Sequence, residues 1–455
     1  MTTKKTRIEP RIVTPDDVKA GSVTAKSLPE MPIDPADLDT RYDWSRPIPA
    51  LGPNAVDFEE RVDFRRLHRY RLARTRQALA ASGLGALLCF DQYNIRYITS
   101  TVIGNWARDK FTRYALLPGT GEPHIWDFGS AAKHHRLFAP WLHQHNCHAG
   151  MLGLRGAVHP RIGLMREAAQ ELKSILDESG VGDMPVGVDV VEPAMLFELQ
   201  AAGIDVRDGQ QVMLDARELK SADEIALLNM SASIVDGTYQ TIAEHLKPGI
   251  RENEIVGLAN HRLYDLGSDD VEAINAISGE RCSPHPHNFT DRLIRPGDQA
   301  FFDIIQSFQG YRTCYYRTFN VGRATDSQRD AYKKAREWID TAIDLVRPGV
   351  RTDQIAACWP EATEIGFTSE MEAFGLLFGH GLGLGLHERP IISRLNSFAD
   401  PQEIKEGMVF ALETYCPASD GYSAARIEEE VVVTPKGAKV ITLYPADELP
   451  IANPY

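Results

Sequence analysis

The sequence predicts an α+β protein in which a smaller α/β domain at residues 59–217 precedes a duplicated domain at residues 218–455. Up to residue 217, short apolar runs typical of buried strands alternate with helical periods. Beyond that point, several blocks of sequence recur in the same order at an offset of about 100 residues. Residues 1–58 carry eight of the 27 prolines and no sustained period, so we expect an extended arm there.

The first domain can be read element by element. A helical stretch at 59–82 ends before Gly83, and the apolar run at 86–90 follows as a strand. Further strands are expected at RYALL and PHIWDF and at 186–191, with helices at 163–179 and 194–202. Ser221, followed three residues later by Glu224, has the spacing of a capping box, which predicts the start of the first helix of the second domain.

Composition limits the classes of partner. The 455 residues carry a formal net charge of −14, which disfavours nucleic acid and anionic membrane surfaces because both would be repelled. Six scattered cysteines without close pairs favour a reducing compartment over a disulfide framework. We find no secretory leader pattern and no run of about 18 apolar residues. We therefore expect a cytoplasmic protein that acts on a small molecule.

The repeat is the most informative feature of the second domain. The segment IAEHLKPGIRENEI at 242–255 matches AIDLVRPGVRTDQI at 342–355, and IRPGDQAFFDI at 294–304 matches IKEGMVFALET at 404–414. Two copies of one supersecondary unit, related by a pseudo-twofold axis, would produce this pattern.

Carboxylates occupy equivalent positions in the two copies. Asp303 aligns with Glu413, each on an otherwise apolar strand, where a lone carboxylate is costly. A two-residue turn at Asp420-Gly421 would place Glu413 opposite Glu428. A turn near Gln309-Gly310 would place Asp303 opposite Cys314 to within a residue or two. Facing carboxylates repel each other, so we expect a cation between them: a metal ion, a cationic substrate, or an arginine from the same hairpins, namely Arg312, Arg317 or Arg426.

Histidines add to this set. His380 and His387 lie in GHGLGLGLHERP, where glycines permit close approach of the backbone, and His285 and His287 lie in SPHPHN. His287 matches His387 at the repeat offset. Because an imidazole titrates near pH 6.5, His387 is the preferred general acid or base.

These motifs, with ARELKSADEI, GYRTCYYRTF, GMVFALE and RIEEEVVVT, resemble the pita-bread family that includes aminopeptidase P, prolidase, methionine aminopeptidase, creatinase and a bacterial dimethylsulfoniopropionate lyase. The resemblance covers residues 60–455 and implies a C-terminal pita-bread domain after a creatinase-like N-terminal domain. It implies that metal ions are held by Asp303, Cys314, His380, Glu413 and Glu428. It also implies catalytic roles for His285, His387 and Glu413, and substrate contacts for His287.

Cys314 departs from the family pattern, because the peptidases have there an aspartate that bridges two metal ions. A thiolate prefers softer ions and binds them with longer bonds, so the usual two-ion centre is in doubt. Two outcomes remain open. One is a single or thiolate-modified site for zinc, iron or manganese. The other is a metal-free pocket of the creatinase type.

The segment at 91–117 is similar to the N-terminal-domain stretch of the lyase and creatinase branches. The resemblance to these branches implies that Tyr97, Trp106, Arg108 and Tyr315 or Tyr316 line or cover the pocket, and that a neighbouring subunit helps to enclose it, as in a homodimer. Where the lyase carries an acidic base this chain has His387, so the same substrate is not implied.

Three hypotheses follow. The first is a hydrolase or lyase that cleaves a carbon–nitrogen, carbon–sulfur or carbon–carbon bond in a small non-peptide compound with the help of a modified metal site. The second is an Xaa-Pro dipeptidase or aminopeptidase, which would need two metal ions despite Cys314. The third is a catalytically inactive scaffold that binds a partner in the same cleft.

Overall fold

The structure, a computed structural model, describes residues 62–455 except 109 and 152, together with Leu38. The described residues fall into two compact units, one of residues 71–213 and one of residues 62–70 and 214–455, and each is described by itself. Apart from Leu38, the arm predicted at 1–58 lies outside the described residues. No helix in the described ranges is both long enough and apolar enough to cross a bilayer.

The first unit is an α/β domain, as predicted. Its mixed sheet has the strand order β4-β3-β2-β1-β5-β6, with β1 parallel to β5 and antiparallel to β2. The strands are β1 (Ala86–Cys89), β2 (Tyr114–Pro118), β3 (His124–Asp127), β4 (Cys147–Ala149), β5 (Val186–Val188) and β6 (Val206–Asp208). The helices in this part of the sequence are α2 (Phe64–Ser82), α3 (Gln92–Thr99), α4 (Gly129–Phe138), α5 (Leu164–Glu178), α6 (Pro193–Ala201) and α7 (Gln210–Arg217). The predicted elements are therefore confirmed to within a few residues at their ends.

The second unit repeats one arrangement of helices followed by a hairpin. The first copy contains α8 (Ala222–His245), α9 (Glu252–Asp265), β7 (Asp270–Ser278), β8 (Gln299–Phe308) and β9 (Tyr311–Val321). The second contains α10 (Asp326–Leu345), α11 (Thr352–Ala356), β10 (Phe378–Gly381), β11 (Glu388–Ile392), β12 (Val409–Pro417), β13 (Ala424–Thr434) and β14 (Gly437–Val440). The short β15 (Ile451–Ala452) ends the chain beside β9.

Local contacts confirm the duplication. Arg251 and Arg351 each precede the second helix of their copy, and each backbone N–H donates to a side chain three residues later. The predicted capping box is also present, since Ser221 N–H donates to Glu224 Oε2 at 2.8 Å and Glu224 N–H donates to Ser221 Oγ at 3.3 Å. The predicted repeat thus describes two structural copies rather than a chance similarity of helix patterns.

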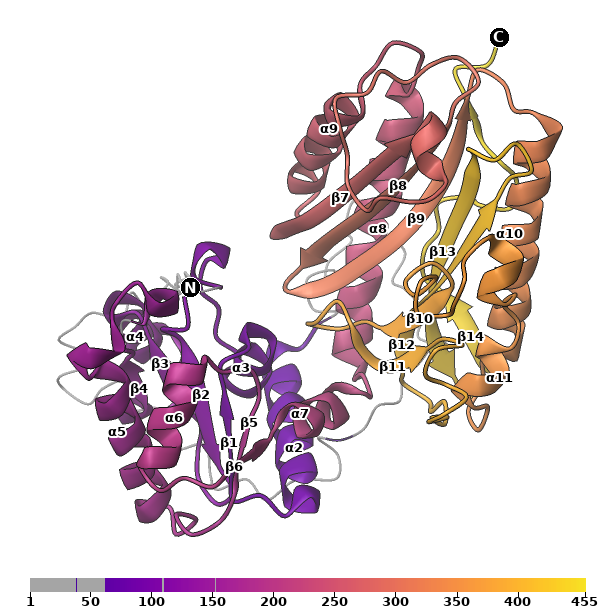
Figure 1. Cartoon of the computed structure of the whole chain (residues 1–455). Helices are drawn as coiled ribbons and strands as arrows, with labels where there is room; N and C mark the ends of the chain where they lie inside the picture. The colour runs from indigo at the N-terminus through magenta and orange to yellow at the C-terminus, as the bar shows by residue number, and fades with distance from the viewer. Residues whose placement is uncertain (1–37, 39–61, 109, 152) are drawn as a thin grey trace, which may run out of the picture. The chain divides into compact units, whose positions relative to one another are not determined.

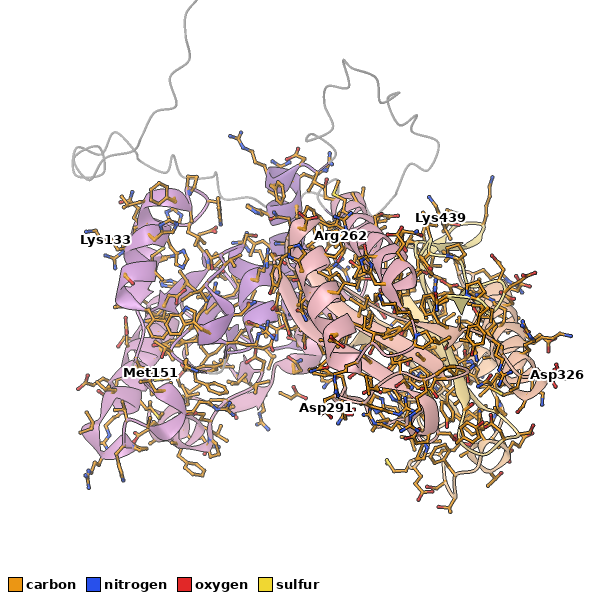
Figure 2. The ribbon with its side chains drawn as sticks, turned by 90° about the horizontal axis from the view of Figure 1, so that it is seen from above. Lys133, Met151, Arg262, Asp291, Asp326 and Lys439 are labelled. Atoms are coloured by element: carbon orange, nitrogen blue, oxygen red, sulfur yellow. The ribbon has the colours of Figure 1, made fainter. Side chains whose placement is uncertain are left out.

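Helices cover the outer faces of the strands. Helices α8 and α9 pack against β7–β9, α10 packs against β12 and β13, and α11 packs against β11, through separate apolar cores for the two copies (Figure 1). Arg262 on α9 and Asp326 at the start of α10 accordingly lie on opposite sides of the strands (Figure 2). The remaining face of each hairpin is turned towards the other copy, and this is where the polar strand residues collect.

The hairpin registers determine which side chains meet. The first hairpin turns through Gln309 and Gly310, both at positive φ, and pairs Asp303 with Tyr316 and Ile305 with Cys314. Cys314 is therefore a diagonal neighbour of Asp303 on the same face, within the predicted margin. The second hairpin pairs Glu413 with Glu428, as predicted.

The turn of the second hairpin is longer than predicted. Its strands end at Pro417 and Ala424, and Ala418 N–H donates to Ser423 O. The four residues between Ala418 and Ser423 thus replace the expected two-residue turn at Asp420-Gly421. The register does not change, because the midpoint of the turn is the same.

Strands β9 and β13 join the two copies. Thr318 Oγ1 donates to the carbonyl of Arg426 at 2.6 Å and accepts from the Arg426 N–H at 2.8 Å. Four strands from the two copies therefore lie over one buried space, β8 and β9 on one side and β12 and β13 on the other.

Candidate metal centre

Five side chains predicted as metal ligands meet in this buried space. They come from five strands, and each is at most 6% exposed: Asp303 on β8, Cys314 on β9, His380 on β10, Glu413 on β12 and Glu428 on β13. The polar residues of these five strands thus converge, as the repeat predicts.

Distances divide the five into groups. One ligand atom each from Cys314, His380 and Glu428 lies within 4.8 Å of the other two. His380 Nε2 is 3.7 Å from Glu428 Oε1 and 3.9 Å from Glu413 Oε1. On the other side, the Cys314 thiol donates to Asp303 Oδ1 at 3.4 Å. The sulfur atom therefore lies between Asp303 and the His380–Glu428 pair.

The backbone orients His380 towards the carboxylates. A register shift between His380 and Gly381 interrupts the pairing of β10 with β11, and His380 Nδ1 lies 3.4 Å from the Gly381 carbonyl oxygen. An Nδ1–H that donates to this carbonyl leaves Nε2 as the free acceptor, which is the state a metal-binding imidazole needs.

The two facing glutamates have different partners. Arg426 donates to Glu413 Oε2, and its guanidinium also lies over the ring of Tyr316 at 4.0 Å. Both oxygens of Glu428, by contrast, are buried without a hydrogen-bond partner among the described residues. Of the three arginines considered from sequence, Arg426 is thus the one that pairs with a carboxylate of the centre. Arg312 donates to Glu272 and Arg317 donates to Glu429.

Burial makes the charged forms of these groups unfavourable. It raises the pKa of Glu413 to about 8 despite Arg426, and it raises the pKa of Glu428 well above its ordinary range, with Glu413 and Asp303 adding to that shift. It raises the pKa of the Cys314 thiol and lowers that of His380 to about 3. Without a cation, the centre therefore favours protonated acids and a neutral imidazole.

The donor set fits a divalent ion. Thiolate, imidazole and carboxylate are all zinc ligands, with bonds of about 2.0 to 2.3 Å, and thiolate with imidazole also suits iron. An ion would satisfy the buried oxygens of Glu428 and neutralise the ionised thiol, which solvent cannot do here. Three protein ligands would leave a coordination position open, as in catalytic rather than structural zinc sites.

Two further glutamates of β13 support the centre. Glu430 Oε1 accepts from the Cys314 N–H and from Thr313 Oγ1, both at 2.7 Å, so it fixes the backbone that carries the thiol. Glu429 lies on the other face of the strand, but it does not reach solvent. Its carboxylate is 7% exposed and pairs with Arg317 and Arg336, each at 2.9 Å.

His285 and Tyr316 form one edge of the site. His285 Nε2 lies 2.7 Å from the Tyr316 hydroxyl, and both side chains are buried. The ring of His287 stacks on His285 with centroids 3.8 Å apart, and burial lowers the pKa of His287 to about 4. The structure therefore brings these predicted substrate-contacting residues together beside the Arg426 guanidinium.

His387 lies beside His380, with ring centroids 4.6 Å apart, and its ring is 6.4 Å from that of Phe378. The residue His387 is exposed. Partial burial of its ring lowers its pKa, and the carboxylate of Glu272 opposes that shift. The next residue, Glu388, is buried and accepts from Lys220 Nζ at 3.0 Å, which holds the strand end in place. His387 thus combines solvent access with proximity to the centre.

The three remaining candidates belong to the first unit. Tyr97 on α3 is buried there, and Trp106 is 63% exposed and packs against Phe128 at 4.9 Å. Arg108 is partly buried. A role for these residues at the pocket stays a prediction.

Sequence reasoning missed Asn275 on β7, whose Nδ2 donates to Asp303 Oδ2 at 2.9 Å, and the supporting role of Glu430. The pairing of β7 with β8, which places Asn275 opposite Asp303, contains a register shift that no sequence pattern announces. For Glu430 a signal existed, since it lies two residues from Glu428 and therefore on the same strand face.

Comparison with known proteins finds relatives of the part of the chain that carries the centre. Residues 226–435 match the model of metallopeptidase family M24. The dimethylsulfoniopropionate lyase DddP of Roseovarius nubinhibens is 24% identical over 421 residues, which cover 87% of this chain and 92% of the lyase. The Xaa-Pro dipeptidase of Pyrococcus furiosus is 29% identical over 235 residues, which cover 51% of this chain and 65% of that enzyme.

Solved structures agree on the fold. The Xaa-Pro dipeptidase from Bacillus anthracis aligns with a TM-score of 0.68 at 21% identity, covering 84% of this chain and 99% of that chain. The dipeptidase PepE from Mycobacterium ulcerans aligns with a TM-score of 0.67 at 24% identity, covering 85% of this chain and 98% of that chain. The expected pita-bread fold with a preceding smaller domain is confirmed.

Proposed function

Because this chain belongs to the pita-bread superfamily of aminopeptidase P, prolidase and dimethylsulfoniopropionate lyase, we propose that it is a metal-assisted enzyme that cleaves a small non-peptide compound. The bond broken is carbon–nitrogen, carbon–sulfur or carbon–carbon. The reaction is hydrolysis or elimination. The matches to the metallopeptidase family model, to the lyase and to the dipeptidase favour an enzyme over an inactive scaffold.

One observation carries the proposal. A thiol, Cys314, lies between Asp303 and the His380–Glu428 pair, at the place where one ligand would have to serve both sides of the centre. A thiolate there favours zinc or iron over the hard ions that all-oxygen bridges suit. In sequence, the match to the lyase extends over most of both chains, whereas the match to the Xaa-Pro dipeptidase of Pyrococcus furiosus covers about half of this chain, and this difference supports a non-peptide substrate.

Each residue of the centre has a role that follows from its position. A bound divalent ion (zinc, iron or manganese) would polarise the substrate or its leaving group, or activate a water molecule. His387, at the solvent-accessible edge of the centre, takes or returns the proton. Tyr316, held by His285 and covered by Arg426, orients the substrate. Glu413 holds Arg426 in place and can accept a proton when it is ionised.

The experiment is elemental analysis of the purified protein together with assays on two substrate panels. One panel contains Xaa-Pro dipeptides, and the other contains dimethylsulfoniopropionate with small betaines, amines and amides. We expect bound zinc, iron or manganese, turnover of a non-peptide compound, and at least 100-fold less activity in Cys314→Asp than in the control Cys358→Ser, which alters a free thiol that contacts the Gln354 carbonyl. Efficient cleavage of Xaa-Pro dipeptides by the native protein would contradict the proposal.

An Xaa-Pro dipeptidase is the second candidate. The observation that favours it is the identity of 29% to the Pyrococcus furiosus dipeptidase over 235 residues, together with retention of Asp303, His380, Glu413 and Glu428. It requires two ions per chain and Xaa-Pro cleavage in the presence of Cys314. A homodimer and a cytoplasmic location stay predictions from sequence.

A further inference from the structure

In the metal-free protein both carboxylate oxygens of Asp303 accept hydrogen bonds, and the one from Asn275 does not depend on the proton of the Cys314 thiol, which an ion would displace. Oδ2 accepts from Asn275 Nδ2 at 2.9 Å, and Oδ1 accepts from the Cys314 thiol at 3.4 Å. Asn275 and Asp303 are directly paired residues of β7 and β8, and they are 8% and 3% exposed. The amide is therefore held in place by the sheet itself rather than by a mobile surface contact.

Asp303 also stands apart from the three residues that can share one ion. Ligands bound at 2.0 to 2.3 Å to one ion lie at most about 4.6 Å from each other, since that is twice the longer bond. Cys314, His380 and Glu428 approach this limit together, and Asp303 is not part of that group. An ion on the Asp303 side would thus be a second ion, and it would compete with the Asn275 amide for the carboxylate.

We propose that Asn275 closes the Asp303 side of the centre, so that the protein binds one ion, on Cys314, His380 and Glu428. The amide is a neutral donor, so it stabilises the Asp303 carboxylate without supplying the charge that a second ion would bring. This inference rests on the metal centre of the proposed function and specifies its stoichiometry. Asn275 would then determine that one ion is bound, although five possible ligand side chains are buried in the centre.

The test is titration of the metal-free full-length protein with Co²⁺, with the bound ions counted by native mass spectrometry and the affinities measured by calorimetry. The proteins are the native chain, Asn275→Ala, Cys314→Asp, and the double variant that carries both changes. Asn260→Ala is the matched control, because Asn260 Nδ2 donates to the Val256 carbonyl within α9 and not to the centre. Asn275→Val, which keeps a residue suited to a strand, serves as the second variant if Asn275→Ala fails to fold.

We expect one tightly bound Co²⁺ in the native chain and in the Asn260→Ala control. Cys314→Asp alone should still bind its second ion weakly, because Asn275 continues to occupy Asp303. Adding Asn275→Ala to Cys314→Asp should strengthen binding of the second ion at least tenfold. Two ions of similar affinity in the native chain, or a second-ion affinity in the double variant equal to that in Cys314→Asp, would overturn the inference.

The two proposals fail in different ways. A native chain that binds one Co²⁺ but turns over no compound in either panel contradicts the proposed function and leaves the role of Asn275 standing. A native chain that cleaves a non-peptide compound while binding two ions contradicts the role of Asn275 alone. Absence of any bound ion in the native chain contradicts both.

Discussion

Glu413 and Glu428 face each other across the β12–β13 ladder, yet only Glu413 among these two has an arginine as its hydrogen-bond partner. The pair is therefore asymmetric in spite of its symmetric register. The arginine neutralises one carboxylate and leaves the other directed at His380 and Cys314. This asymmetry leads to opposite expectations for substitutions at the two positions.

In the metal-free protein at pH values above about 8, where Glu413 is ionised, Glu413→Gln should lower the free energy of unfolding by about 2 kcal/mol, because the buried Arg426 loses a charged hydrogen-bond partner. Glu428→Gln should leave the unfolding free energy unchanged or raise it, since it replaces a buried acid whose ionisation is opposed. Urea unfolding of the metal-stripped variants measures both. Equal destabilisation by the two substitutions would contradict the asymmetry.

The stability of the metal-free protein should fall between pH 6.5 and 8.5. The pKa values of Glu413 and Glu430 are raised to about 8 by burial, so below that pH the folded state holds protons that the unfolded state has released. Stability therefore decreases as pH rises through this window. His380, whose pKa is lowered to about 3, contributes its pH dependence only below about 6.5.

Thermal unfolding as a function of pH tests this expectation. Addition of Zn²⁺ should raise the midpoint more at pH 8.5 than at pH 6.5, because an ion stabilises the ionised carboxylates. Glu430→Gln should flatten the decline, because it removes one of the titrating groups. A midpoint that rises steadily from pH 6.5 to 8.5 without metal would show that these acids are ionised in the folded protein.

Loss of the thiol should alter the bound metal directly. Cobalt bound to thiolate has an intense sulfur-to-metal charge-transfer absorption, so the native protein loaded with Co²⁺ should display it and Cys314→Ser should not. We expect Co²⁺ affinity to fall at least tenfold in that variant. Cys358→Ser should retain both properties, and retention of the absorption in Cys314→Ser would exclude Cys314 as a ligand.

His387→Ala should reduce kcat by at least 100-fold, within the range that general acid or base groups contribute, while KM changes by less than about threefold. The reason is that His387 lies at the exposed edge of the centre and is absent from the group of three ligands. His245→Ala, at the exposed end of α8, is the control. Full activity of His387→Ala would remove its proposed role.

Much of the centre could be predicted because the residues of a hairpin pair symmetrically outward from the midpoint of its turn. The facing of Glu413 and Glu428 followed from the midpoint of the second turn even though the turn is longer than expected. Cys314 came out opposite Ile305 instead of Asp303, but both positions share a strand face, so the thiol and the carboxylate still meet. The repeat predicted the rest, since equivalent strands of two copies must lie together.

Other features could not be predicted for physical reasons. Burial of Glu429 could not be predicted from the alternation of side chains along β13, because α10 covers the strand face that points away from the centre, and both faces are therefore buried. The Asn275 contact depends on the register of β7, which shifts within the strand. The sequence allowed several cations beside Glu413. Only the structure shows that Arg426 is the one that pairs with it.

The two copies contribute unequally to the centre, with Asp303 and Cys314 from the first and His380, Glu413 and Glu428 from the second. Neither half of the domain could bind an ion as the whole does. An ancestor with a single copy would have needed two molecules to assemble such a centre, and only after fusion could the halves diverge, with a sulfur on one side and a histidine on the other.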